Sequence, residues 1–95
     1  MAYKVSVIVP IYKVEKFIAR CAKQLFEQTL PEVEYIFVND CTPDNSMLEL
    51  AKTIQAYPHK EHAIRICTHE VNKGLPSARN TGLQHAQGEF IFHCD

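Results

Sequence analysis

No run of apolar residues in this 95-residue sequence approaches the ~20 residues that a membrane-spanning helix needs. Lysine and arginine are scattered and the net charge is −1, so we expect no basic surface for nucleic acid or for an anionic membrane. The first ten residues, MAYKVSVIVP, lead straight into a strand pattern and lack the features of a signal peptide. We therefore expect a cytoplasmic protein, with peripheral membrane association left open for a full-length form.

The sequence also lacks any C-x-x-C pair, because its cysteines, at positions 21, 41, 67 and 94, are widely spaced. Cys21 falls on the apolar face of a helix pattern, and Cys67 and Cys94 fall in strand patterns. We interpret the cysteines as free, buried or half-buried thiols in a reducing compartment. The alternative is a secreted domain with two disulfides, which no targeting signal supports.

Strand and helix patterns alternate regularly along the chain. Runs rich in β-branched and aromatic residues predict strands over residues 5–10, 33–38, 63–68 and 90–94. Helices are predicted over residues 14–26, about 43–56 and about 77–86. In the last helix the small residues Ala78, Gly82 and Ala86, at spacing four, allow close packing. The order β-α-β-α-β-α-β predicts one α/β domain over residues 1–95, with three layers, a mainly parallel sheet and right-handed crossovers.

The stretch from Val33 to Ser46, VEYIFVNDCTPDNS, organises the rest of the chain. Its apolar run stops at a polar pair that ends in Asp40, and a helix-start signal follows at once. Thr42 is the predicted N-cap, Pro43 suits the first helical position, and Asp44 favours the positive end of the helix dipole. Since ligands bind at the carboxyl edge of open α/β sheets, Asp40 is a candidate binding residue. The alternative is that Asp40 is an ordinary turn residue.

Three common phosphate-binding or phosphorylation sites are absent. The loop after the first strand has no glycine, so it does not match the G-x-G-x-x-G of dinucleotide-binding folds. No P-loop motif occurs anywhere in the chain. A receiver-type phosphorylation domain would need an acidic pair after the first strand and an aspartate after the third, and neither is present.

Five segments nevertheless resemble, in order and at compatible spacing, motifs of family 2 glycosyltransferases. VSVIVPIYKVEKFIARC, over residues 5–21, resembles their opening strand with its P-x-Y turn, and EQT, over 27–29, the end of their first helix. IFVNDCTPDNS, over 36–46, resembles their V-D-D-G-S-x-D-x-S segment. NKGLPSARNTGL, over 72–83, resembles N-x-G-L-x-x-A-R-N-x-G-L, and GEFIFHCD, over 88–95, resembles the strand that leads into their D-x-D metal motif.

Two positions depart from that family pattern. Asn39 stands where the first acid of a pair is usual, and Cys41 stands where glycine is usual, while Asp40 retains the second acid. The chain reaches only the first acid of the metal motif, at Asp95. The resemblance therefore implies the front half of an enzyme, with the catalytic base beyond residue 95 and no transfer expected from these residues alone.

The resemblance implies the GT-A fold of nucleotide-diphospho-sugar transferases, with sheet order 3-2-1-4, truncated after strand four. It implies an enzyme of polysaccharide biosynthesis that takes a sugar from a nucleotide diphosphate, a UDP-sugar in our interpretation. The sugar would pass with inversion to a hydroxyl of a saccharide or other acceptor. A divalent cation, Mg²⁺ or Mn²⁺, would neutralise charge on the departing diphosphate.

The same resemblance, combined with the chemistry of each side chain, gives the candidate site. Tyr12 offers an aromatic face to uracil, with Pro10 as a rigid wall, and Asp40 would accept the hydrogen bond from uracil N3. Arg79 could reach the ribose or diphosphate, and Asp95 would hold the cation and the ribose. The alternatives are that Tyr12 is a half-buried loop aromatic and Arg79 a solvated helix charge.

Two other functions stay open at this point. A nucleotide-binding module without chemistry would bind nucleotide sugars but not turn them over. An α/β interaction domain without a ligand would bind no nucleoside diphosphate. Separately, the strand over 90–94 is apolar on both faces, which predicts that the chain forms homo-oligomers through it.

Overall fold

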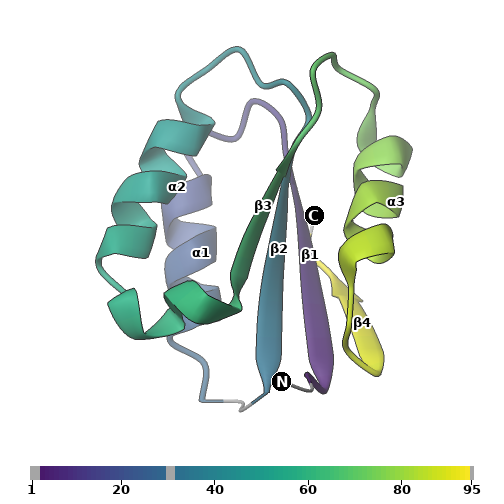
Figure 1. The fold of residues 1–95 in the computed structure, drawn as a ribbon. Helices are drawn as coiled ribbons and strands as arrows, with labels where there is room; N and C mark the ends of the chain where they lie inside the picture. Colours follow the sequence, from purple (N-terminus) through teal and green to yellow (C-terminus); the bar gives the residue numbers. More distant parts are fainter. Residues whose placement is uncertain (1–2, 30–31, 95) are drawn as a thin grey trace.

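The computed structural model describes residues 3–29 and 32–94 (Figure 1). Strands and helices alternate as predicted, with one added 3₁₀ helix, η1. Their bounds are β1 Val5–Ile11, α1 Ile18–Phe26, β2 Val33–Asn39, α2 Ser46–Gln55, η1 Pro58–Ala63, β3 Ile64–Thr68, α3 Leu75–His85 and β4 Phe90–His93.

The four strands form one parallel sheet in the order β3-β2-β1-β4, which confirms the predicted order. Figure 1 shows α1 and α2 on one face of this sheet and α3 on the other, so the domain has the three expected layers. Because all strands run the same way, their carboxyl ends lie at one edge, and the loops that leave them are neighbours.

The core lies mainly between the sheet and α1. The central residues of β2, from Tyr35 to Val38, are at most 2% exposed, because helices cover both faces of that strand. The Phe26 ring of α1 makes edge contacts with the rings of Tyr35 and Phe37, at centroid distances of 5.1 and 6.1 Å. Helix α1 therefore serves core packing, through its buried residues Ile18, Ala22, Leu25 and Phe26.

The start of α2 corrects the predicted cap. The helix begins at Ser46, and Thr42 does not cap it. The Thr42 hydroxyl accepts the Lys13 amide at 2.7 Å and donates to Asp44 Oδ1 at 2.7 Å. The same Oδ1 accepts from the Ser46 hydroxyl at 2.6 Å and from the Ser46 amide at 3.1 Å. Hydrogen bonds, that of the Ser46 hydroxyl first, lower the pKa of Asp44 to about 2. The Asp44 carboxylate, a stronger acceptor than a hydroxyl, therefore accepts the first amide of α2 in place of Thr42.

The other boundaries shift by a few residues. Helix α1 begins at Ile18 rather than at 14, because Val14 opens a turn in which its carbonyl accepts the amides of Phe17 and Ile18. Helix α3 begins at Leu75, two residues earlier than predicted, with a proline in its first turn.

Within the described part of the chain, no helix is long and apolar enough to cross a membrane.

Strand β4 leaves a large apolar surface open. Phe90, Ile91 and Phe92 are 60%, 39% and 54% exposed, and in the described part of the chain the one strand that pairs with β4 is β1. An unpaired apolar edge is a template for self-association.

We expect the purified 95-residue chain to self-associate through β4, with an apparent mass that rises with concentration in light scattering. The variant Phe92→Lys should reduce this association, because a charge opposes burial of the edge. The matched control is Leu48→Lys on α2, which changes a residue that is 54% exposed and distant in sequence. A wild-type chain that stays monomeric at every concentration would rule out the interface.

Candidate functional site

A pocket of about 360 Å³ opens at the carboxyl edge of the sheet, within the size range of small-molecule sites. Its walls come from the end of β1 and the loop after it, the residue that follows β2, the loop between β3 and α3, and the start of α3. The lining residues are Pro10, Ile11, Tyr12, Val14, Asp40, Asn72, Gly74, Leu75 and Ala78. The fold thus brings together Pro10, Tyr12 and Asp40, three residues singled out in the sequence.

Tyr12 directly follows β1 and is 41% exposed, so its ring is accessible to a ligand. The ammonium group of Lys13 lies 5.4 Å from the centre of this ring, a cation–π distance. Pro10, which lies in β1 two residues before Tyr12, is half-buried and supplies a rigid part of the wall. An aromatic face beside a rigid apolar wall suits a planar heterocycle.

The Asp40 carboxylate is surrounded by hydrogen-bond donors from the chain itself. Its side chain is almost fully buried and turned into the loop between β3 and α3. Oδ1 lies 2.8 Å from His69 Nδ1 and accepts the Lys73 amide at 2.8 Å. Oδ2 accepts the Asn72 side-chain amide at 3.0 Å and the Gly74 amide at 2.8 Å. A carboxylate offers about four lone-pair sites, so the predicted hydrogen bond from uracil N3 would have to displace one of these donors.

The electrostatics of Asp40 favour an ionised carboxylate. Burial by itself raises the pKa of this group, but hydrogen bonds from His69 and from the Lys73 and Gly74 amides hold the pKa below its ordinary value of 3.8. Gly74 is the residue before α3, so the carboxylate lies at the positive end of that helix. Gly74 has a φ of 93°, which glycine tolerates best, and this conformation aims its amide at Asp40.

His69 and Asn72 are functional candidates that the sequence reasoning missed. His69 is buried directly after β3, and its second ring nitrogen, Nε2, lies 2.7 Å from the Thr81 hydroxyl of α3. Since the Asp40 carboxylate can only accept, His69 Nδ1 carries the proton between them. A signal was available: His69 follows a strand at the carboxyl edge, and Asn72 opens the segment that resembles the N-x-G motif.

The two remaining predicted site residues are Arg79 and Asp95. Arg79 is half-buried one turn into α3 and is not among the described residues that line the pocket. Asp95, the predicted metal ligand, lies outside the described residues. Among residues 3–29 and 32–94, no group of three or more His, Cys, Asp or Glu side chains could hold a metal ion.

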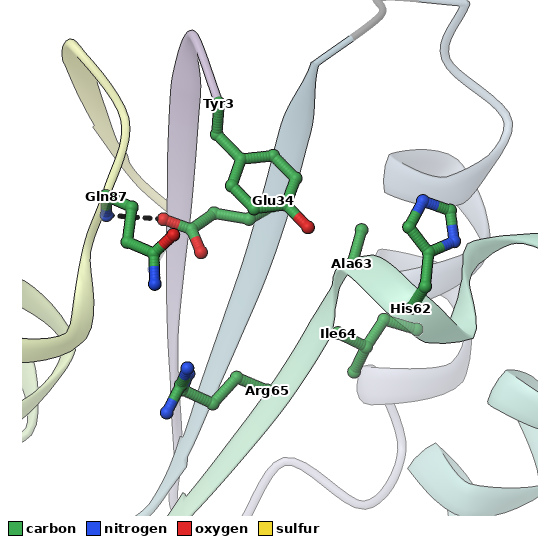
Figure 2. Close-up of a pocket in the computed structure, with 7 residues that line it drawn as sticks. All are labelled: Tyr3, Glu34, His62, Ala63, Ile64, Arg65 and Gln87. Carbon is green, nitrogen blue, oxygen red and sulfur yellow. Dashed lines mark hydrogen bonds between the residues drawn. The ribbon is translucent and has the colours of Figure 1, made fainter. Parts of the chain in front are cut away.

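A second pocket, of about 290 Å³, lies at the opposite edge of the sheet (Figure 2). It is lined by Tyr3, Glu34, His62, Ala63, Ile64, Arg65 and Gln87. The buried Glu34 carboxylate accepts the Ser6 hydroxyl and the Gln87 amide, both at 2.6 Å. These bonds fix the loop between α3 and β4 to the sheet. We interpret this carboxylate as structural, because the amino edge of a parallel sheet is not where ligands usually bind.

Comparison with known proteins identifies relatives along nearly the whole chain. The model of "Glycosyl transferase family 2" matches residues 6–95. The uncharacterized glycosyltransferase EpsJ of Bacillus subtilis is 45% identical over 91 residues, which cover 96% of this chain and 25% of EpsJ. The poly(ribitol-phosphate) beta-N-acetylglucosaminyltransferase TarS of Staphylococcus aureus is 34% identical, over 97% of this chain and 16% of TarS.

Two solved structures share the fold. TarS residues 1–349 in complex with UDP-GlcNAc superpose with a TM-score of 0.81 at 35% identity, over 97% of this chain and 26% of that one. The mannosyltransferase PcManGT of Pyrobaculum calidifontis, in complex with GDP-Man and Mn²⁺, gives a TM-score of 0.86 at 26% identity, over 96% of this chain and 26% of that one. The chain thus spans about a quarter of these structures and of EpsJ.

Proposed function

Since the chain belongs to glycosyl transferase family 2, as the match over residues 6–95 shows, we propose that it binds the UDP-sugar donor of an inverting glycosyltransferase. The observation that carries this proposal is the carboxyl-edge pocket, where Pro10 and Tyr12 form one wall and the loop held by Asp40 forms another. The complexes of TarS with UDP and with UDP-GlcNAc support a uridine nucleotide. That of PcManGT with GDP-Man indicates that the fold alone does not fix the base.

Asn72 is the residue that would recognise the uracil edge in this proposal. Its side-chain nitrogen donates to Asp40, at 3.0 Å to Oδ2 and 3.2 Å to the main-chain oxygen. No hydrogen bond among the described residues uses the amide oxygen of Asn72. Since Asn72 is exposed and lines the pocket, this oxygen is free to accept a hydrogen bond from a ligand. Uracil has an N–H at N3, whereas cytosine has an acceptor at that atom. Asp40 then acts through Asn72 by fixing which end of the amide faces the base.

The rest of the reaction follows from the chemistry of inverting transfer. An acceptor hydroxyl, on a saccharide or other acceptor, must lose its proton to a base as it attacks the sugar. Asp40 does not suit that task, because its oxygens are already filled by donors from the 69–74 loop. A divalent cation such as Mg²⁺ or Mn²⁺, when bound, would neutralise charge on the diphosphate. Asp95 is the residue of this chain proposed to hold it, in line with the Mn²⁺ in the PcManGT complex.

We expect UDP to bind about tenfold more tightly than CDP, which corresponds to about 1.4 kcal/mol for one hydrogen bond. In Asn72→Ala the affinities for UDP and CDP should become about equal, because the acceptor for uracil N3–H is gone. Isothermal titration calorimetry with both nucleotides on the purified protein measures the effect. The control is Asn80→Ala, which removes an exposed amide from α3. Equal affinities in the wild-type protein would contradict the assignment, and a thermal melt of Asn72→Ala separates loss of recognition from unfolding.

A further inference from the structure

Two cysteine side chains far apart in the sequence meet beside the sheet. The sulfur atoms of Cys21 and Cys94 lie 3.6 Å apart, although 73 positions separate the residues. Cys21 is in the first turn of α1, and Cys94 directly follows β4. Both side chains are half-buried free thiols. The other two cysteines have no such neighbour among the described residues, since Cys67 faces His85 and Cys41 faces a carbonyl oxygen.

The backbone holds both members of this pair in place. The amide of Cys94 donates to the Ile8 carbonyl of β1 at 2.9 Å, which continues the sheet one residue beyond β4. The amide of Cys21 donates to the Phe17 carbonyl at 3.0 Å, in the turn that starts α1. A disulfide requires the sulfurs to approach to about 2.05 Å, a movement of roughly 1.5 Å that side-chain rotation can supply.

A small apolar pocket gives access to the pair. It has a volume of about 230 Å³ and is lined by Val9, Pro10, Val14, Phe17, Ile18, Cys21 and Cys94. A molecule as small as hydrogen peroxide fits in this space. Pro10 and Val14 also line the carboxyl-edge pocket, so the two thiols lie behind a wall of the candidate nucleotide site.

We propose that Cys21 and Cys94 are an oxidation site, at which hydrogen peroxide forms a reversible disulfide between α1 and the end of β4. The Cys94 thiolate attacks one peroxide oxygen, the O–O bond breaks, and hydroxide leaves to give a sulfenic acid at Cys94. The Cys21 sulfur then attacks the sulfenic sulfur, and the S–O bond breaks. One peroxide oxygen leaves as hydroxide in each step, and the protons of the two thiols convert both hydroxides to water. Two thiols and one peroxide thus become one disulfide and two water molecules, and the peroxide is reduced.

The order of the two steps follows from the surroundings of Cys21. Burial and the neighbouring Cys94 sulfur raise the pKa of Cys21 to about 12, so this thiol is protonated at neutral pH and is a poor nucleophile. Cys94 is therefore the sulfur that meets peroxide first. In the second step Cys21 loses its proton as its sulfur attacks the sulfenic sulfur of Cys94, which lies within reach at 3.6 Å.

The test uses a Cys41→Ser/Cys67→Ser background, in which Cys21 and Cys94 are the only thiols. After treatment with peroxide at low protein concentration, we expect the intact mass to fall by about 2 Da, and peptide mapping without reduction should link Cys21 to Cys94. Because the link joins distant positions, the melting temperature should rise by roughly 10 °C. Dithiothreitol should reverse both changes.

Single replacements test the order of the steps and the alternatives. With Cys21→Ser in this background, Cys94 should be labelled by a sulfenic-acid reagent such as dimedone, without a link. With Cys94→Ser, Cys21 should stay unlabelled. Unlinked thiols after treatment, or crosslinked dimers as the main product, would overturn the proposal. Labelling of Cys21 in the Cys94→Ser variant would overturn the order of the steps. None of these readouts depends on nucleotide binding.

Discussion

Asp40→Asn is expected to impair nucleotide binding and folding almost as severely as Asp40→Ala, although asparagine has nearly the size of aspartate. In the folded protein donors surround both carboxylate oxygens of Asp40. Asparagine keeps one oxygen and replaces the other by an NH₂ group, which would face two of these donors. Since a buried donor left without an acceptor costs about 1–3 kcal/mol, we expect Asp40→Asn to lower the free energy of unfolding by about 2–4 kcal/mol.

For Asp40→Ala we expect a loss of about 3–5 kcal/mol, comparable to breaking a buried pair. In both variants the affinity for UDP should fall by tenfold or more, because the loop that carries Asn72 and Gly74 loses its anchor. Urea unfolding and calorimetry measure the two effects. Glu70→Gln is the matched control, since it neutralises an exposed carboxylate in the same loop and should change neither quantity. An Asp40→Asn protein with wild-type stability would show that the carboxylate is not this anchor.

The same prediction has a pH dependence. The pKa of Asp40 is lowered in the folded protein relative to its ordinary value of 3.8. Its contribution to stability is therefore complete above about pH 4, where the unfolded chain is also ionised, and is lost as the pH falls through the folded pKa. The difference in unfolding free energy between the wild-type protein and Asp40→Ala should be largest near neutral pH and should narrow in acid.

Gly82→Ala is the second change for which we expect a large effect. Gly82 is buried where α3 crosses β1, and a Cβ atom there would lie 2.4 Å from Ile8 Cγ2. Ile8 is fully buried, so its side chain would have to shift within a close-packed core. In an exposed helix the same replacement would stabilise the protein by up to about 1 kcal/mol. Here we expect a net loss of about 2 kcal/mol, because overpacking a closed interface outweighs the gain in helix propensity.

A thermal melt measures this loss, which should lower the melting temperature by roughly 10 °C. Gln84→Ala, at an exposed position of the same helix, is the control and should leave the melting temperature nearly unchanged. Helix α3 also supplies Leu75 and Ala78 to the pocket, so displacement of the helix should weaken UDP binding as well. A Gly82→Ala protein that melts at or above the wild-type temperature would show that α3 does not pack this closely.

Local patterns in the sequence determined the kind and order of the elements. The apolar, β-branched runs from Val5 and from Val33 predicted buried strands, and the spacing of Ile18, Ala22, Leu25 and Phe26 predicted one face of a helix, as the structure shows. The small residues Ala78 and Gly82 predicted the close contact that Gly82 makes with Ile8. These features depend on neighbours within a few positions, so the sequence alone specifies them. The strand order came from the resemblance to a family, since periodicity does not carry it.

Only the tertiary structure decided which groups the Asp40 carboxylate contacts. The sequence placed its carboxylate at the carboxyl edge of β2, which is correct, but the direction of the side chain depends on His69, Asn72 and Gly74, about thirty positions away. Similarly, nothing within either segment connects Cys21 to Cys94 before the sheet places β4 beside β1. An ionised group turns toward the nearest set of donors, and which donors are nearest is fixed by how separate parts of the chain pack together.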